Sequence, residues 1–261
     1  MRSFEVVKTS SGIEVCRGEP LRCWADLNTD CIRGGRLCGT SGNGTRLLAD
    51  HVRREPLADD FFRLCHDDRS GTLRLSEDAT RIGLASALIG ELGWAGILNV
   101  EDGLLSVRGG STPGDAVAHA VLDDIRGERT PRDVRTWLTY LSMEAYERVA
   151  RRLVAANHVI PQEGRRLLRR FTFYQPTDTN DFVWPRVRLG TALAQRRPLD
   201  QKDVHLLGIA DATGLLPIIL DGGGQAATAY FEHLVQQSHA DVQTLIQETR
   251  VVIGNKVMNG R

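Results

Sequence analysis

The fold is decided by residues 76–93, which read Ser76-Glu77-Asp78 followed by ATRIGLASALIGEL and a closing Gly93. Ser76 is a preferred N-cap residue, and the two acids after it suit the positive end of a helix dipole. The apolar residues recur at helical spacing and cover more than one face. This segment therefore predicts a helix that lies at the centre of the core and ends at Gly93.

Short β elements are predicted on both sides of this helix. Upstream, residues 66–71 read as a polar turn, and Thr72 to Leu75 read as a short strand. Downstream, Ile97 to Val107 is predicted to form a hairpin around Glu101-Asp102-Gly103. Asp-Gly supplies the positive φ angles that a tight hairpin turn requires.

Later helices are predicted from their start signals and apolar spacing. Thr112-Pro113 and Thr130-Pro131 each place a hydroxyl residue before proline, which is tolerated at the first helical position. The second of these helices is expected to continue, after a break, to Val154. A short basic helix is expected after Pro161, and the chain beyond Val204 has the spacing of further helices. The basic helix would contain Arg165, Arg166, Arg169 and Arg170.

An aromatic segment follows the expected basic helix. Residues 171–185 are predicted to form a hairpin or a compact loop, because aromatic residues flank a polar stretch at residues 176–180. Phe171 and Phe173 alternate with Thr172, a pattern that fits either an exposed anchor or a strand packed on the core. The side chains assigned to the exposed hairpin are Phe173, Tyr174, Phe182 and Trp184.

The whole chain is predicted to be mainly α: a single compact helical domain with one or two short β-hairpins. At 261 residues, 41% of them hydrophobic, the chain can bury a sizeable core. Residues 1–50 lack apolar periodicity and are rich in Gly and Ser, so they are expected to be a poorly structured arm or a start of translation assigned too early. Residues 51–261 are expected to form the domain.

Composition and spacing exclude several classes. No stretch reaches the roughly 18 to 20 apolar residues that span a bilayer, so a cytoplasmic protein is expected. The spacing of Cys16, Cys23, Cys31 and Cys38 does not match close-set zinc ligands, and we expect neither a metal nor a cofactor. Net charge is zero, yet residues 126–197 carry fifteen Arg against seven acids. Such a block suggests an anionic partner, although a solvated Arg-rich surface explains it as well.

Several strings occur in an order that resembles the Golgi phosphoprotein 3 family, especially its bacterial members. They are Asp59-Asp60-Phe61-Phe62, His66-Asp67-Asp68-Arg69-Ser70-Gly71, residues 83–92, Thr112-Pro113-Gly114-Asp115, Pro131 to Leu138, and residues 148–154. The resemblance covers about residues 57–261. It implies a mostly helical, non-enzymatic adaptor at the membrane periphery. Such a protein would bind phosphatidylinositol 4-phosphate, or another anionic lipid headgroup, at a shallow basic pocket. Its hairpin would meet the membrane or a second copy.

The resemblance also implies positions for headgroup binding. Eukaryotic members place a Trp and three Arg where this chain has Ser76, Ala85, Met143 and Tyr146. Arg74, Arg81 and Arg148 lie near these positions and are the candidates to form a basic pocket instead.

Other functions remain open from the sequence. Residues 149–170 have the outline of a winged helix-turn-helix, although the family order accounts for more of the chain and no nucleic-acid partner is expected. A scaffold that acts through protein partners or self-association is a further alternative. His51, His66, Asp67 and Asp68 are too few for a hydrolase metal site, and we assign no catalytic residue.

Overall fold

The computed structural model describes residues 6–8, 14–16, 55–108, 112–130, 132–166 and 169–259. The chain divides into two units, residues 1–39 and 40–261. In the first unit, strands β1 (Val6–Lys8) and β2 (Glu14–Cys16) pair antiparallel. Apart from these strands, the poorly structured arm expected over residues 1–50, with the remaining cysteines, lies outside the described residues.

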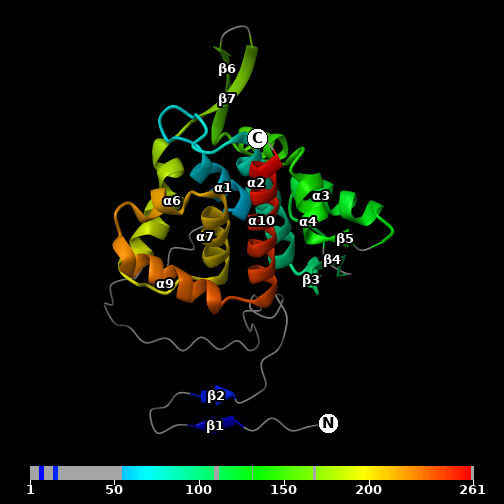
Figure 1. Ribbon diagram of the computed structural model, residues 1–261, viewed down its shortest axis with the longest axis vertical. Helices are drawn as coiled ribbons and strands as arrows, with labels where there is room; N and C mark the ends of the chain where they lie inside the picture. Colours follow the sequence, from blue (N-terminus) through cyan, green and yellow to red (C-terminus); the bar gives the residue numbers. More distant parts are fainter. Residues whose placement is uncertain are drawn as a thin grey trace, which may run out of the picture. The chain divides into compact units, whose positions relative to one another are not determined.

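The second unit is mainly helical, as expected (Figure 1). Its described helices are α1 (Leu57–Cys65), α2 (Glu77–Trp94), α3 (Ala116–Gly127), α4 (Val134–Leu141), α5 (Ala145–Ala155), α6 (Thr179–Ala194), α7 (Gln201–Thr213), α8 (Leu216–Leu220), α9 (Gly224–Gln236) and α10 (Ala240–Asn259). None of these helices is both long and apolar enough to cross a lipid bilayer.

Two small antiparallel sheets complete the second unit. One has the order β3 (Leu98–Glu101), β4 (Leu104–Val107), β5 (Arg132–Asp133), and the other pairs β6 (Val159–Arg166) with β7 (Arg169–Pro176). Asp102 and Gly103 have φ angles of 52° and 76°, which confirms the predicted tight turn. The strand expected at residues 72–75 is reduced to a single bridge between His66 and Leu73.

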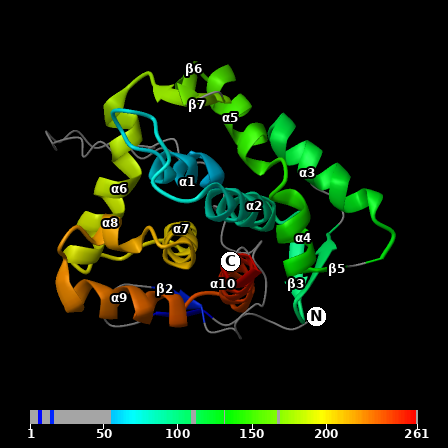
Figure 2. The ribbon, with the colours of Figure 1, turned by 45° about the horizontal axis from the view of Figure 1, so that its top comes forward.

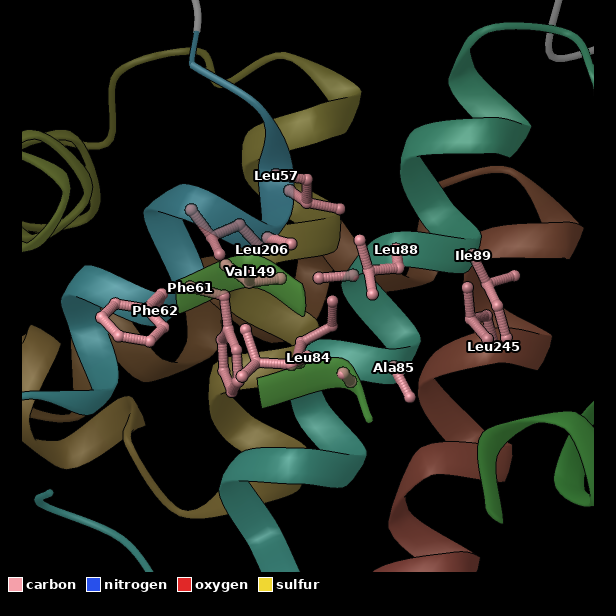
Figure 3. Close-up of a cluster of buried hydrophobic side chains, with 14 of the residues drawn as sticks. Leu57, Phe61, Phe62, Leu84, Ala85, Leu88, Ile89, Val149, Leu206 and Leu245 are labelled. Carbon is pink, nitrogen blue, oxygen red and sulfur yellow. The ribbon is translucent and has the colours of Figure 1, made fainter. Parts of the chain in front are cut away.

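Helix α2 is the centre of the core, as its pattern predicts. The Ser76 hydroxyl accepts a hydrogen bond from the backbone N–H of Ala79 at 3.3 Å, so the expected N-cap is confirmed. In Figure 2, α2, α7 and α10 are seen nearly end-on, and the other helices surround them. Figure 3 shows Leu84, Leu88 and Ile89 of α2 among side chains of neighbouring helices. Helix α2 continues one residue past Gly93, and Gly96 adopts the left-handed conformation that ends it.

The starts of α3 and α4 differ from the prediction. Aspartates cap both helices: Asp115 accepts from the N–H of Val117 at 2.8 Å, and Asp133 accepts from that of Thr136 at 2.9 Å. Each cap lies three residues after the predicted threonine cap, Thr112 or Thr130, because a carboxylate satisfies the free N–H groups more strongly than a hydroxyl. The expected break between α4 and α5 is present at residues 142–144.

A buried guanidinium fastens four helices together. Arg152 of α5 donates hydrogen bonds to Asp59 of α1 at 2.8 Å and to Glu91 of α2 at 2.9 Å. It also lies 3.4 Å from a carboxylate oxygen of Asp115, the cap of α3. Burial raises the pKa of Asp59 to about 7, although Arg152 opposes this shift. One side chain therefore fixes the positions of α1, α2, α3 and α5 relative to one another.

Candidate functional site

The β6–β7 hairpin stands out from the helices in Figure 1. Its register runs from Val159 opposite Pro176 to Arg166 opposite Arg169, so only two residues connect the strands. In the sequence these two residues are Leu167 and Leu168, and arginines flank them: Arg165, Arg166, Arg169 and Arg170. The sequence from residue 165 to residue 170 thus combines two apolar residues with four cationic ones.

This hairpin corrects two predictions. The expected basic helix after Pro161 is wrong, since its arginines lie at the end of β6 and the start of β7. The expected hairpin over residues 171–185 is displaced toward the N-terminus, because Asp178 caps α6 and accepts from the N–H of Asn180 at 2.8 Å. The winged helix-turn-helix outline loses its second helix with this change.

The four aromatic residues assigned to the hairpin are divided between two elements. Phe173 and Tyr174 lie on β7, as expected. Phe182 lies on α6 and is buried, so it belongs to the core. Trp184 also lies on α6, and 51% of it is exposed. The prediction that Phe182 and Trp184 belong to the hairpin is wrong, because Asp178 caps a helix that begins before both residues.

Part of the hairpin surface is apolar and exposed. Phe171 of β7 is 44% exposed and Ile160 of β6 is 47% exposed. The Phe171 ring lies over Gly164, its cross-strand partner, where an added Cβ would collide with the ring. Its ring centroid is 6.0 Å from that of Phe173, so both aromatics share one face.

The base of the hairpin packs on the helical body. The Tyr174 ring lies 5.8 Å from that of Tyr146 and 6.0 Å from that of Phe62, both edge-on. Gly71, with φ of 67°, leaves no room for a Cβ beside the Tyr174 carbonyl oxygen. His66 Nε2 lies 3.0 Å from the Tyr146 hydroxyl, which ties α1 to α5 below the hairpin. Contacts of this kind fix the direction in which the hairpin extends.

Each of the three candidate headgroup arginines is paired with carboxylates. Arg74 lies 2.7 Å from Asp68 and donates to the His66 carbonyl oxygen at 2.9 Å. Arg81 pairs with Glu147, next to Tyr146 in the chain, at 3.3 Å. Arg148 bridges two carboxylates, those of Asp124 at 2.7 Å and of Glu144 at 2.8 Å. A phosphate that approached these guanidinium groups would compete with acids already in place.

The positions matched to the family's headgroup residues have structural roles here. Ser76 is exposed and caps α2, whereas Ala85 is fully buried and its side chain is not available to a headgroup. Met143 is 60% exposed in the connection between α4 and α5. Tyr146 is half-buried, and burial raises the pKa of its hydroxyl, which therefore stays neutral.

Strand β6, with its exposed Ile160, was not predicted from the sequence. A usable signal was present, because Leu167-Leu168 between two arginine pairs is followed by the alternating run Phe171-Thr172-Phe173. Period-two alternation on one side of the arginines indicates a strand more strongly than a helix.

Together, the fold and this site define a class of protein: a mainly helical domain with a basic, partly apolar hairpin. Residues 57–249 match the sequence profile described as Golgi phosphoprotein 3 (GPP34). Because the match spans well over half of the chain, this chain belongs to the Golgi phosphoprotein 3 family. No curated protein matches the chain at a significant level.

Proposed function

We propose that this chain is a peripheral membrane protein that binds anionic lipid surfaces through the β6–β7 hairpin. The observation that supports this most is the hairpin itself, whose strands extend beyond the helices (Figure 1). In the sequence, Leu167 and Leu168 stand between these strands, and four arginines flank them. Stable attachment to a membrane takes two signals, and an apolar tip beside a basic cluster supplies both. Membership of the Golgi phosphoprotein 3 family is consistent with a role as a lipid-binding adaptor.

The proposed selectivity is for negative charge rather than for one phosphoinositide. Recognition of a phosphate monoester needs several free guanidinium groups in a fixed arrangement. The matched positions Ser76, Ala85, Met143 and Tyr146 carry no cation. The neighbouring Arg74, Arg81 and Arg148 are held by carboxylates. The hairpin arginines then dominate binding, and phosphatidylinositol 4-phosphate contributes through its charge.

Sedimentation of the full chain with vesicles tests this function. We expect no binding to phosphatidylcholine vesicles and clear binding to phosphatidylglycerol vesicles, weakened by physiological salt. Vesicles with phosphatidylinositol 4-phosphate should bind no more tightly than phosphatidylglycerol vesicles of equal charge. Arg166→Glu with Arg169→Glu should weaken binding more than tenfold, since each basic residue contributes about 1 kcal/mol near an anionic surface. Arg126→Glu with Arg129→Glu, the same double change at exposed positions outside the hairpin, is the matched control.

An apolar substitution separates insertion from charge attraction. Phe171→Ser should weaken binding several-fold, whereas Leu104→Ser, equally exposed at 44% on β4, should not. Binding that requires phosphatidylinositol 4-phosphate would contradict the proposed selectivity. Absence of binding to every anionic vesicle would contradict the function.

A scaffold that self-associates through the hairpin is the second candidate. Among the described strands, β6 and β7 pair only with each other, so each leaves one edge with free backbone groups. Such edges can pair with a second chain. Two results together would favour this role: the chain binds no vesicles, and sedimentation velocity shows a concentration-dependent dimer. Phe171→Ser should abolish that dimer.

A further inference from the structure

A cavity of about 390 Å³ lies where α1 meets α6 and α7. Helix α1 contacts both of the other helices, and the three are neighbours in Figure 2. None of the three candidate headgroup arginines lines this cavity. Its volume is within the range of small-molecule sites, and its walls are rich in charged side chains.

Ion pairs organise the inner wall. Arg63 of α1 contacts Asp60 at 3.2 Å, and Asp60 in turn contacts Arg188 of α6 at 3.0 Å. Arg188 also bonds Asp203 of α7, so the pairs form an alternating chain across three helices. These groups satisfy one another and hold the wall rigid.

The three cations that line the cavity differ in their partners. Arg63 and Arg188 are paired with carboxylates, and the Arg63 side chain is only 2% exposed, so an incoming ligand does not reach it. Lys202, half-buried at the start of α7, forms no ion pair with any described residue. Its ammonium group is therefore the cation of this lining that can pair with an incoming oxyanion.

The outer wall of the cavity favours a cationic group on the ligand. Asp181 and Trp184 lie three residues apart and share one face of α6. The Asp181 side chain is 53% exposed and lies 3.4 Å from His158, which attracts it only when protonated. Trp184, 51% exposed, presents an indole beside this carboxylate. A carboxylate next to an accessible indole suits an organic ammonium ion, through ion pairing and cation–π attraction.

We propose that this cavity binds a small zwitterion that carries a primary ammonium group and an oxyanion. The oxyanion lies toward Lys202, and the ammonium group lies between Asp181 and Trp184. A simple anion fits poorly, because five carboxylates line the cavity against three permanent cations. A simple cation leaves the Lys202 ammonium group without an anionic partner among the described residues. Phosphoethanolamine, free or as a lipid headgroup, has the required chemistry.

Isothermal titration calorimetry of the full chain tests the site with phosphoethanolamine, ethanolamine and inorganic phosphate. We expect the Kd for phosphoethanolamine to be at least tenfold lower than the Kd for either half. Lys202→Gln and Asp181→Asn should each raise it at least fivefold with an unchanged melting temperature. Lys256→Gln and Asp123→Asn, which make the same chemical changes at exposed positions outside the cavity, should have no effect.

Vesicles distinguish the two sources of the ligand. Binding to phosphatidylcholine vesicles only when they contain phosphatidylethanolamine, and loss of that binding in Lys202→Gln, would assign the site to the lipid headgroup. Binding of the free compound alone would assign it to a soluble ligand. Equal affinities for phosphoethanolamine and its halves, or no effect of the cavity variants, would overturn the inference. None of these results depends on the hairpin, because no vesicle in this test is anionic.

Discussion

His66 illustrates how much one buried side chain can determine. Its Nδ1 lies 2.7 Å from the Phe62 carbonyl oxygen, which can only accept, so Nδ1 carries the proton. Nε2 is then left to accept from the Tyr146 hydroxyl at 3.0 Å. The ring also stacks on Phe62 at a centroid distance of 4.0 Å. The acceptor role of Nε2 requires the neutral imidazole, and burial lowers the pKa of His66 to about 4 although the Phe62 hydrogen bond opposes this shift.

The low pKa of His66 predicts a loss of stability in acid. Between pH 6.5 and about 4 the unfolded chain binds a proton that the folded chain does not, so stability falls as pH falls. His66 should account for about 2 to 3 kcal/mol of the loss between pH 7 and 4.5. Urea unfolding of the wild-type chain and of His66→Gln checks this, since other groups contribute equally to both. The stability difference between the two proteins should shrink on acidification; a constant difference would contradict the prediction.

The candidate arginines show why a binding site is harder to predict than a helix. Arg74, Arg81 and Arg148 remain a prediction as headgroup residues. The i,i+4 pair of Glu144 with Arg148 can be read from the sequence, whereas Asp124 and Glu147 become partners of Arg148 and Arg81 only when α2, α3 and α5 are packed. Ion pairs across elements depend on tertiary geometry, which no local pattern encodes.

At the scale of elements, short-range signals were predictable. Ser76 and the Asp102-Gly103 turn were placed correctly because their effects operate within three or four residues. The β6–β7 hairpin was not predicted at its observed position, because its pairing joins residues as far apart as Val159 and Pro176. Its arginines and leucines favour helix locally. Cross-strand pairing and the contact of Tyr174 with Tyr146 outweigh that preference.

Gly71 should be more sensitive to substitution than Gly103. Both glycines have positive φ angles, 67° and 76°, so alanine introduces similar backbone strain at each. Only at Gly71 would the new Cβ collide with the Tyr174 backbone, whereas nothing lies within 4 Å at Gly103. Gly71→Ala should therefore destabilise the chain by about 1 to 3 kcal/mol more than Gly103→Ala in urea unfolding. Equal losses would show that the hairpin base is not tightly packed.

At the scale of the molecule, a single core accounts for the described helices. Buried residues from α1 through α10 form one contiguous cluster, with α2 at its centre. Arg152 adds a polar connection among four of these helices. Such a core predicts that residues 55–259 unfold in one cooperative step.

Removal of residues 1–50 should leave this core intact. The family match begins at residue 57, and no residue before Leu57 belongs to the buried cluster among the described residues. The fragment 51–261 should melt within about 2 °C of the full chain, since a change of 1 kcal/mol moves Tm by about 2–4 °C at this size. Differential scanning calorimetry checks this. A much lower melting temperature for the fragment would show that the first fifty residues contribute to the core.

The length of the hairpin has an electrostatic consequence. From Pro161, opposite Tyr174 at the packed base, to Arg166 the chain advances five residues, or about 17 Å when extended. In physiological salt the Debye length is about 8 Å. When the tip touches a surface and the hairpin stands upright, the charges of the helical body lie about two Debye lengths away. The zero net charge of the whole chain then does not determine adsorption to a charged membrane, because salt screens the charges that lie far from the tip.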